Sequence, residues 1–191
     1  KAPEFILHVS RTRGAGRWVQ HVGTSGSSYV LQMATSAETD YSGYGTIASP
    51  TATTFGINGI DGIGGESADY VAYVWHSVEG YSKFGTYEGN GNSNGPYIYT
   101  GFRPQLIAIK NIEQSSNWVI YDSARQTFNP NENYLRWNSS ATEGGTSTSF
   151  DIDFLSNGYK VRSTETDLNT SGKTFVYCAW GDVPFKYNNA F

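Results

Sequence analysis

Two aspartates are the clearest candidates for chemistry in this sequence. Asp151 and Asp153 alternate with Phe150, Ile152 and Phe154, so an extended strand would turn both carboxylates to one face and the apolar side chains to the other. Carboxylates on one strand face lie about 7 Å apart, a separation that glycoside hydrolases use. A glycan depolymerase is one interpretation, and a solvated strand face is the simpler one. A Ca²⁺ site at the same pair lacks support from any Asp-rich loop of recognised spacing.

Tyrosines beside Gly-, Asn- and Ser-rich turns suggest a second kind of site. A flat aromatic ring can cover the C–H face of a sugar while nearby polar groups bond its hydroxyls. These tyrosines are therefore candidates for contacts with a glycan, and packing in the core is the simpler interpretation. The candidate ligand-binding residues are Tyr41, Tyr44, Tyr87, Tyr97 and Tyr99.

Histidine and cysteine give weaker signals. His8, His21 and His76 have no histidine counterparts in the internal repeat described below, so a site of base and nucleophile would be private to the first half. The single Cys178 lies in an apolar run and cannot form an intrachain disulfide. We expect it to be a buried thiol. The sequence predicts no catalytic residues, no metal site and no cofactor.

Composition excludes several function classes. The 191 residues carry a formal charge of −4, and only 16% of them are charged. Without a basic patch, binding of nucleic acid is not expected. No apolar run approaches the roughly 20 residues of a membrane-spanning helix, so no membrane partner is expected.

The elements that must position these residues are strands. Ile and Val together number 22 against 6 Leu, and branched side chains favour strands whereas Leu favours helices. Short apolar runs such as 5–7, 70–75 and 175–177 stand between turns rich in Gly, Ser and Asn. The sequence therefore predicts an all-β protein.

The chain also contains an internal repeat with a spacing of roughly 100 residues. Residues 3–7 are echoed by 104–108, Trp18-Val19 by Trp118-Val119, 31–37 by 135–141, and 70–78 by 175–183. Five such matches, with 55–57 against 159–161 as the fifth, keep the same order. They predict two tandem homologous β-sandwich units of jelly-roll type, residues 1–80 and 81–191, with matched tryptophans in the cores.

The segment between the units predicts an asymmetry. Residues 84–103 read as a strand, a turn and a strand, which we interpret as a lead hairpin of the second unit. The first unit has no counterpart before Pro3, so we expect its lead hairpin to be missing or borrowed from elsewhere. An open first unit would expose unpaired strand edges, and such edges invite pairing with a partner.

A family resemblance rests on the motifs from Val78 to Gly91, from Gly95 to Pro104, from Trp118 to Arg125 and from Ile152 to Arg162. The chain resembles a duplicated C-terminal β-domain of unknown function found in tailed-phage virion proteins. The resemblance implies a non-enzymatic structural component on the exterior of a phage particle, such as a tail fibre, a capsid fibre or a receptor-binding appendage. It implies other virion proteins as partners and, by analogy, a homo-oligomer such as a trimer. It supplies no catalytic residues.

Two rival functions stay open beside this one. The first is a carbohydrate-binding module that contacts glycans of the host surface through the tyrosines named above. The second is the glycan depolymerase that uses Asp151 and Asp153.

Overall fold

Nearly all regular secondary structure is antiparallel strand in the computed structural model, which describes residues 1–12, 17–42, 50–56, 68–145 and 148–182. The all-β prediction is confirmed. The strands are β1 (Phe5–Ser10), β2 (Trp18–His21), β3 (Tyr29–Gln32), β4 (Thr39–Asp40), β5 (Tyr70–Trp75), β6 (Ser82–Glu88), β7 (Tyr97–Tyr99), β8 (Pro104–Asn111), β9 (Val119–Asp122), β10 (Tyr134–Arg136), β11 (Ile152–Leu155), β12 (Gly158–Val161) and β13 (Thr174–Gly181). The described residues also include a 3₁₀ turn, Thr148–Phe150, and a short helix, α1 (Thr166–Asn169).

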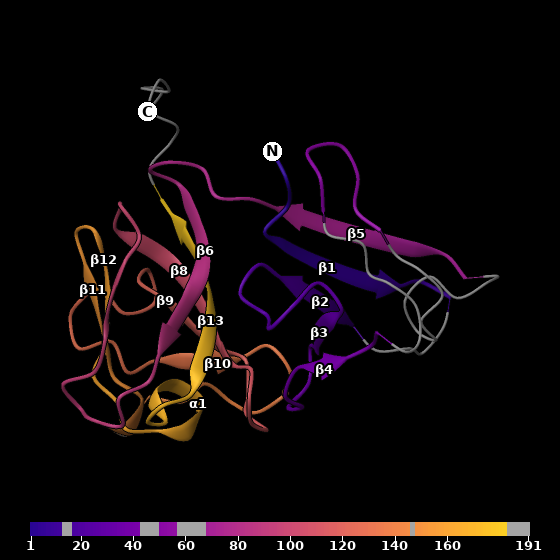
Figure 1. Ribbon diagram of the computed structural model, residues 1–191. Coiled ribbons are helices and arrows are strands. Elements are labelled where there is room, and N and C mark those ends of the chain that lie inside the picture. Colours follow the sequence, from indigo (N-terminus) through magenta and orange to yellow (C-terminus); the bar gives the residue numbers. More distant parts are fainter. Residues whose placement is uncertain (13–16, 43–49, 57–67, 146–147, 183–191) are drawn as a thin grey trace.

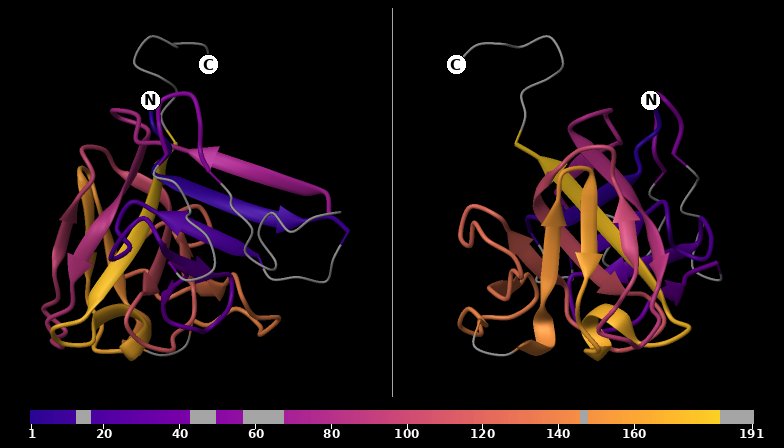
Figure 2. Two further views of the ribbon diagram at one scale, coloured as in Figure 1. Left: turned by 45° about the vertical axis from the view of Figure 1, so that its right-hand side comes forward. Right: turned by 90° about the vertical axis from the view of Figure 1, so that its left-hand side faces the viewer.

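Three sheets form successive layers (Figure 1). The first sheet has the strand order β4-β3-β2-β1-β5 and comes from the N-terminal part of the chain. The central sheet, β10-β9-β8-β13-β6, and the outer sheet, β11-β12-β7, come from the C-terminal part. The strands of the first sheet run across those of the central sheet rather than alongside them (Figure 2).

The core between the central and outer sheets is the larger of two. Ile152 and Phe154 of β11 point inward, as their alternation with the aspartates predicts, and meet Tyr159, Phe175 and other buried side chains. The inward residues of this core include Tyr87, Ile98, Ile107, Ile109, Val119, Tyr121, Phe150, Val161, Leu168, Tyr177 and Ala179. These two sheets therefore form a β-sandwich.

A second core joins the first sheet to the opposite face of the central sheet. Phe5, Val19 and Leu31 pack there against central-sheet residues that include Trp118 and Cys178. Cys178 is fully buried, as expected from its apolar run. Aromatic rings contact one another in this core. Phe5, for example, stacks on Phe84 with a centroid distance of 5.9 Å.

Polar contacts also tie the first sheet to the rest of the molecule. The indole N–H of Trp118 donates to the Gln32 carbonyl at 2.9 Å. The backbone N–H of Ser116 donates to the Thr35 carbonyl at 2.8 Å. The buried Lys110 ammonium donates to the same carbonyl at 3.2 Å, and burial lowers the pKa of Lys110 to about 8. Lys110 also donates to the Ser116 carbonyl and hydroxyl within its own half. The bonds across the boundary complete the hydrogen bonding of these groups, so the two halves support each other.

Corresponding strands in the two halves occupy the same places in their sheets. The order β3-β2-β1-β5 of the first sheet parallels β10-β9-β8-β13 of the central sheet. Phe5 lies opposite Trp75 in the first sheet, and Leu106 lies opposite Trp180 in the central sheet. These are the partners expected from the sequence match of residues 3–7 with 104–108 and of 70–78 with 175–183.

The match of Trp18 with Trp118 is wrong by one residue. His8 lies opposite Trp18, whereas Ile109 lies opposite Val119, so Val119 holds the place of Trp18. Side chains alternate along a strand, so this shift puts the two tryptophans on opposite faces. Trp118 points into the core between the first and central sheets. Trp18 points away from it and contacts the ring of Tyr41.

The predicted lead hairpin over 84–103 is not formed. β6 pairs with β13 in the central sheet, and β7 pairs with β12 in the outer sheet. The intervening loop crosses between the layers and is held by the buried Asn169, whose amide donates to Asn90 and to the Asn92 carbonyl. Tyr87 and Ile98 thus reach one core from opposite sheets, which a hairpin within a single sheet would not permit.

The two units also differ in what they contain. Strands β6 to β13 lie within the predicted second unit, residues 81–191, and form a sandwich of two sheets. Within the described part of residues 1–80, the strands form one sheet, which packs against the second unit. The first unit therefore shares a core with the second, whereas the sequence predicted a separate core for each.

Candidate functional site

The exposed face of the outer sheet gathers several of the residues predicted from the sequence. Across the three strands, Asp153 lies opposite Lys160, and Lys160 lies opposite Tyr97. The neighbouring row contains Gly158 opposite Tyr99. Since the residues between them point into the core, these side chains share the outward face.

Tyr97 and Tyr99 form a pair of exposed rings on the edge strand β7. Their exposed fractions are 45% and 64%. The hydroxyl of Tyr97 donates to Asn157 Oδ1 at 2.7 Å, which fixes the position of that ring. β7 packs so closely against Gly158 that a side chain there would clash. A Cβ would lie 2.1 Å from the Ile98 carbonyl oxygen and 3.2 Å from the Tyr97 ring. The two rings can serve as a flat apolar platform with polar neighbours.

A polar hollow of about 420 Å³ lies beside β11, at the edge of the outer sheet opposite to β7. Its lining includes Asp151, Asp153, Arg162, Asn129 and Ser93. Arg162 donates to Asp153 at 3.0 Å. Strands are spaced by about 4.8 Å, so Tyr97 on β7 stands about 10 Å from Asp153 on β11, two strands away.

Asp151 has the most unusual surroundings in this hollow. It is only 9% exposed, and its Oδ1 has no hydrogen-bond partner within the described residues. Burial raises the pKa of the Asp151 carboxyl above its usual value, and the charges of Glu132 and Asp153 raise it further. The nearby Arg162 opposes this effect. Asp151 thus has one unpartnered oxygen that is itself buried, and it lies next to a carboxylate that already pairs with a cation.

This arrangement can bind hydroxyl groups. The carboxylates that line the hollow can accept hydrogen bonds from hydroxyls, and the Arg162 guanidinium can donate to the oxygens beside them. A carboxyl of raised pKa next to a second carboxyl is also the arrangement that general acid catalysis of glycoside cleavage requires. The geometry of the aspartates thus leaves both glycan interpretations standing.

Family comparison adds one finding. Residues 1–184 match the model of a domain of unknown function, DUF7483. The chain belongs to the DUF7483 family. No curated protein and no solved structure shows a significant match to it. The function of this DUF7483 chain must therefore be argued from its own residues.

The other tyrosines predicted for glycan contact lie elsewhere in the DUF7483 chain. Tyr87 is only 9% exposed, stacks on Phe175, and donates its hydroxyl to the Leu168 carbonyl. It is a core residue, because β6 turns it inward. Tyr41 follows β4 and contacts Trp18 edge to face. Tyr44 lies outside the described residues. Among the four candidates that the structure describes, Tyr97 and Tyr99 are the two brought together.

The histidines do not form a nucleophile site in the described part of the chain. His21 is buried between the first and central sheets, where Nδ1 accepts from the Gly23 N–H and Nε2 contacts the Tyr177 carbonyl. Burial lowers the pKa of His21 to about 4. His8 lies on the opposite face of the first sheet, and burial lowers its pKa too.

Neither a cluster of metal ligands nor a membrane-spanning helix occurs in the described ranges. Within them, no three His, Cys, Asp or Glu side chains are placed to hold a metal ion together. The helical segments described are also too short and polar for any of them to span a bilayer.

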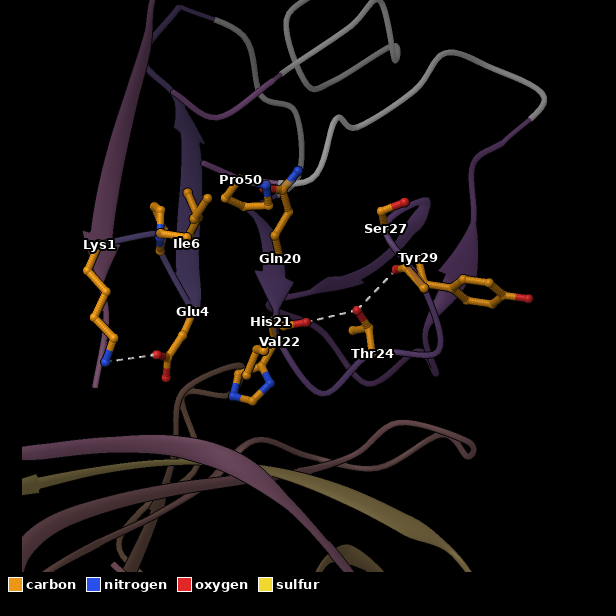
Figure 3. A pocket seen from close by; sticks show the side chains of 13 residues that line it. Lys1, Glu4, Ile6, Gln20, His21, Val22, Thr24, Ser27, Tyr29 and Pro50 are labelled. Atoms are coloured by element: carbon orange, nitrogen blue, oxygen red, sulfur yellow. Dashed lines mark hydrogen bonds and ion pairs between the residues drawn. The ribbon is translucent and has the colours of Figure 1, made fainter. Parts of the chain in front are cut away.

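Two further hollows adjoin the first sheet. The one in Figure 3, of about 420 Å³, has Ile6, Val22 and Pro50 among its apolar lining. Lys1 pairs with Glu4 at its rim. The other is an apolar cleft of about 600 Å³ between the first and central sheets, lined by residues that include Trp75, Leu106 and Trp180.

Sequence reasoning missed the basic partners of the aspartates. Lys160 belongs to β12 and Arg162 directly follows it; β12 returns antiparallel to β11 after the turn at Ser156-Asn157. The signal was present, because Asn157-Gly158 between two alternating runs predicts a tight hairpin. That hairpin places residues 160 and 162 beside 153 and 151. Asn129 and Ser93 come from distant loops, and no local pattern points to them.

Proposed function

We propose that this DUF7483 chain is a non-enzymatic structural component of a bacteriophage particle, in a tail fibre, a capsid fibre or a receptor-binding appendage. The observation that carries the proposal is the resemblance of the motifs from Val78 to Pro104 and from Ile152 to Arg162 to a domain of tailed-phage virion proteins. The bonds of Trp118 and Lys110 support it, because they tie the first sheet to the central sheet without a disulfide. Its partners are other virion proteins and further copies of itself, with a trimer as the expected assembly on the particle exterior.

We also propose that the two halves descend from one duplicated unit. A single shift of 101 residues brings β1 and β2 onto β8 and β9 with both ladders in register. The pairing of β1 with β5 matches that of β8 with β13. Two unrelated sheets would have no reason to share both strand order and register. A tandem repeat supports a structural role, since stacked units extend a fibre.

The virion proposal is tested on purified particles. Quantitative mass spectrometry should find the chain at a fixed copy number beside the other virion proteins, in a multiple of three. Cryo-EM of the same particles should place its three-layer density on the exterior. Particles that lack the protein, together with a secreted monomer in the lysate, would overturn the proposal.

Carbohydrate binding is a second candidate, and one specific observation favours it. Tyr97 and Tyr99 expose adjacent rings about 10 Å from Asp153, roughly the length of a disaccharide. Asp151, Asp153 and Arg162 offer acceptors and donors at the far end. The acidic lining favours neutral sugars over uronates, since like charges repel.

A glycan array of neutral and uronate-containing bacterial polysaccharides tests this candidate. We expect neutral glycans to bind the wild type, and the double variant Tyr97→Ala/Tyr99→Ala to lose about tenfold or more in affinity. Tyr73→Ala is the matched control, because Tyr73 is exposed on the first sheet. Equal loss in the control, or no binding by folded wild type, would remove the carbohydrate candidate and leave the virion proposal intact.

The same material separates binding from hydrolysis. If a bound polysaccharide becomes shorter on incubation, and Asp151→Asn abolishes the shortening while binding persists, the chain is a glycan depolymerase. Unchanged polymer length with wild-type protein assigns the two aspartates to binding alone.

A further inference from the structure

The edge of the first sheet at β5 lacks a strand that the central sheet possesses. In the central sheet, β13 lies between β8 and β6. In the first sheet, the corresponding β5 pairs with β1 on one side, and no described strand pairs with its other side. The difference shows in exposure: Cys178 and Ala179 of β13 are 0% exposed, whereas Tyr73 and Val74 at the same places of β5 are 49% and 43% exposed.

The main chain of β5 is ready to pair on this open side. The Arg11 N–H donates to the Asp69 carbonyl, and the Glu4 N–H donates to the Trp75 carbonyl. Because bonding alternates along an antiparallel ladder, residues 71, 73 and 75 face β1, and the N–H and C=O groups of Ala72 and Val74 face the open side.

This edge also lacks the features that prevent strand pairing. Natural sheets protect their edges with short strands, charged residues or proline. At the opposite edge of the first sheet, β4 has two residues and includes Asp40. The edge strand β6 carries Lys83 and Glu88. β5 has six residues, none of them charged.

An apolar cleft lies beneath the same edge. In the central sheet, Phe84 of β6 sits opposite Cys178 and packs among Phe5, His21 and Trp180. The corresponding position beside β5 would lie near Leu106 and Trp75, which are the counterparts of Phe5 and Trp180. Both line the 600 Å³ apolar cleft. The cleft is therefore the place that an aromatic residue like Phe84 would fill.

We propose that β5 is an acceptor for an extended segment of β6 chemistry that a partner protein supplies. The segment pairs antiparallel with β5. It completes the first sheet as β6 completes the central sheet. Its apolar side chain, preferably Phe, stands opposite Tyr73 and enters the cleft between Trp75 and Leu106. This mode of recognition combines main-chain bonds for affinity with one pocket for specificity.

A peptide with the sequence of residues 81–89 is the probe. Isothermal titration should give saturable binding to wild-type protein, and the same peptide carrying Phe84→Ala should bind about tenfold or more weakly, because the cleft loses its apolar occupant. Hydrogen exchange should slow at Ala72 and Val74 when the wild-type peptide is bound.

Two protein variants locate the binding. Ala72→Pro removes the outward N–H and should abolish binding, whereas the matched variant Ala72→Val keeps that N–H and should retain binding within about twofold. Circular dichroism shows whether each variant is folded, and Val74→Lys provides a second edge variant that does not perturb the backbone.

Three results would overturn the proposal. Absence of peptide binding to folded wild type is the first. Binding that is indifferent both to the peptide's phenylalanine and to Ala72→Pro is the second. The third is a self-associated wild type, with a mass above the 21.0 kDa of one chain, that Ala72→Pro converts to monomer, because the occupant would then be a second copy.

Discussion

The first and central sheets place corresponding strands in the same order, yet they are supported differently. The central sheet is covered on one face by the outer sheet and on the other by the first sheet. Its positions Ile109, Val119 and Tyr121 point into the larger core. The corresponding positions of the first sheet hold His8, Trp18 and Gln20, which bury polar atoms. The Trp18 N–H has no hydrogen-bond partner in the described part of the chain, and His8 and Gln20 interact with each other.

This difference shows which half of the molecule contributes more to its stability. A buried polar group without a partner costs about 1–3 kcal/mol, whereas a buried aliphatic or aromatic side chain contributes about 1.5–3 kcal/mol. One strand order is therefore stabilised strongly in the C-terminal half and weakly in the N-terminal half. The first sheet depends on its contact with the central sheet, through Phe5, Val19 and Leu31.

The largest expected effect compares Phe175 with Tyr70, which hold corresponding places on β13 and β5. Phe175 is fully buried and stacks on Tyr87 with a centroid distance of 5.0 Å. Phe175→Ala should lower the free energy of unfolding by about 3–5 kcal/mol. Tyr70→Ala, at a partly exposed position, should cost less than about half of that. Urea denaturation measures both, and equal losses would contradict the unequal support of the two sheets.

The next effect concerns pH and the boundary between the sheets. His21 is neutral in the folded state because burial lowers its pKa to about 4, against about 6.5 in an unfolded chain. Protonation of Nδ1 would also break its bond with the Gly23 N–H. Between pH 6.5 and 4 the folded state binds fewer protons at His21 than the unfolded state does. The contribution of neutral His21 to the free energy of unfolding is therefore complete above pH 6.5 and is lost as the pH falls towards 4. The loss amounts to about 3 kcal/mol.

Chemical denaturation at a series of pH values checks this prediction. His21→Gln should flatten the fall in stability between pH 6.5 and 4. A smaller slope should persist, because burial also lowers the pKa of His8 on the other face of the same sheet. A pH profile unchanged in His21→Gln would show that the boundary does not depend on a neutral imidazole.

Much of the fold could be predicted from local patterns. Period-two alternation identified β11 and the inward direction of Ile152 and Phe154, and the apolar run around Cys178 identified a central strand. Alternation also placed Asp151 and Asp153 outside the main core. These successes depend on side-chain direction within one strand, which the sequence encodes directly.

Pairing between distant strands could not be predicted in the same way. The segment 84–103 has the composition of a hairpin, yet β6 and β7 join different sheets, because their partners β13 and β12 lie far along the chain. Tyr87 and Tyr97 flank the same Gly- and Asn-rich segment, residues 89–95. Tyr87 nevertheless lies in the core, whereas Tyr97 is exposed. Only the choice of partner strand decides between them.

The smallest expected effect tests the register shift that separates the two tryptophans. Trp118→Phe removes the indole N–H that donates to the Gln32 carbonyl, leaves that acceptor without its partner, and should cost about 2 kcal/mol. Trp18→Phe removes a buried N–H that has no partner among the described residues, so the relief offsets part of the lost volume and the cost should stay below about 1 kcal/mol. Thermal and urea unfolding of both variants measure the difference. Equal costs would contradict the register shift and would favour a ladder in which Trp118 corresponds to Trp18.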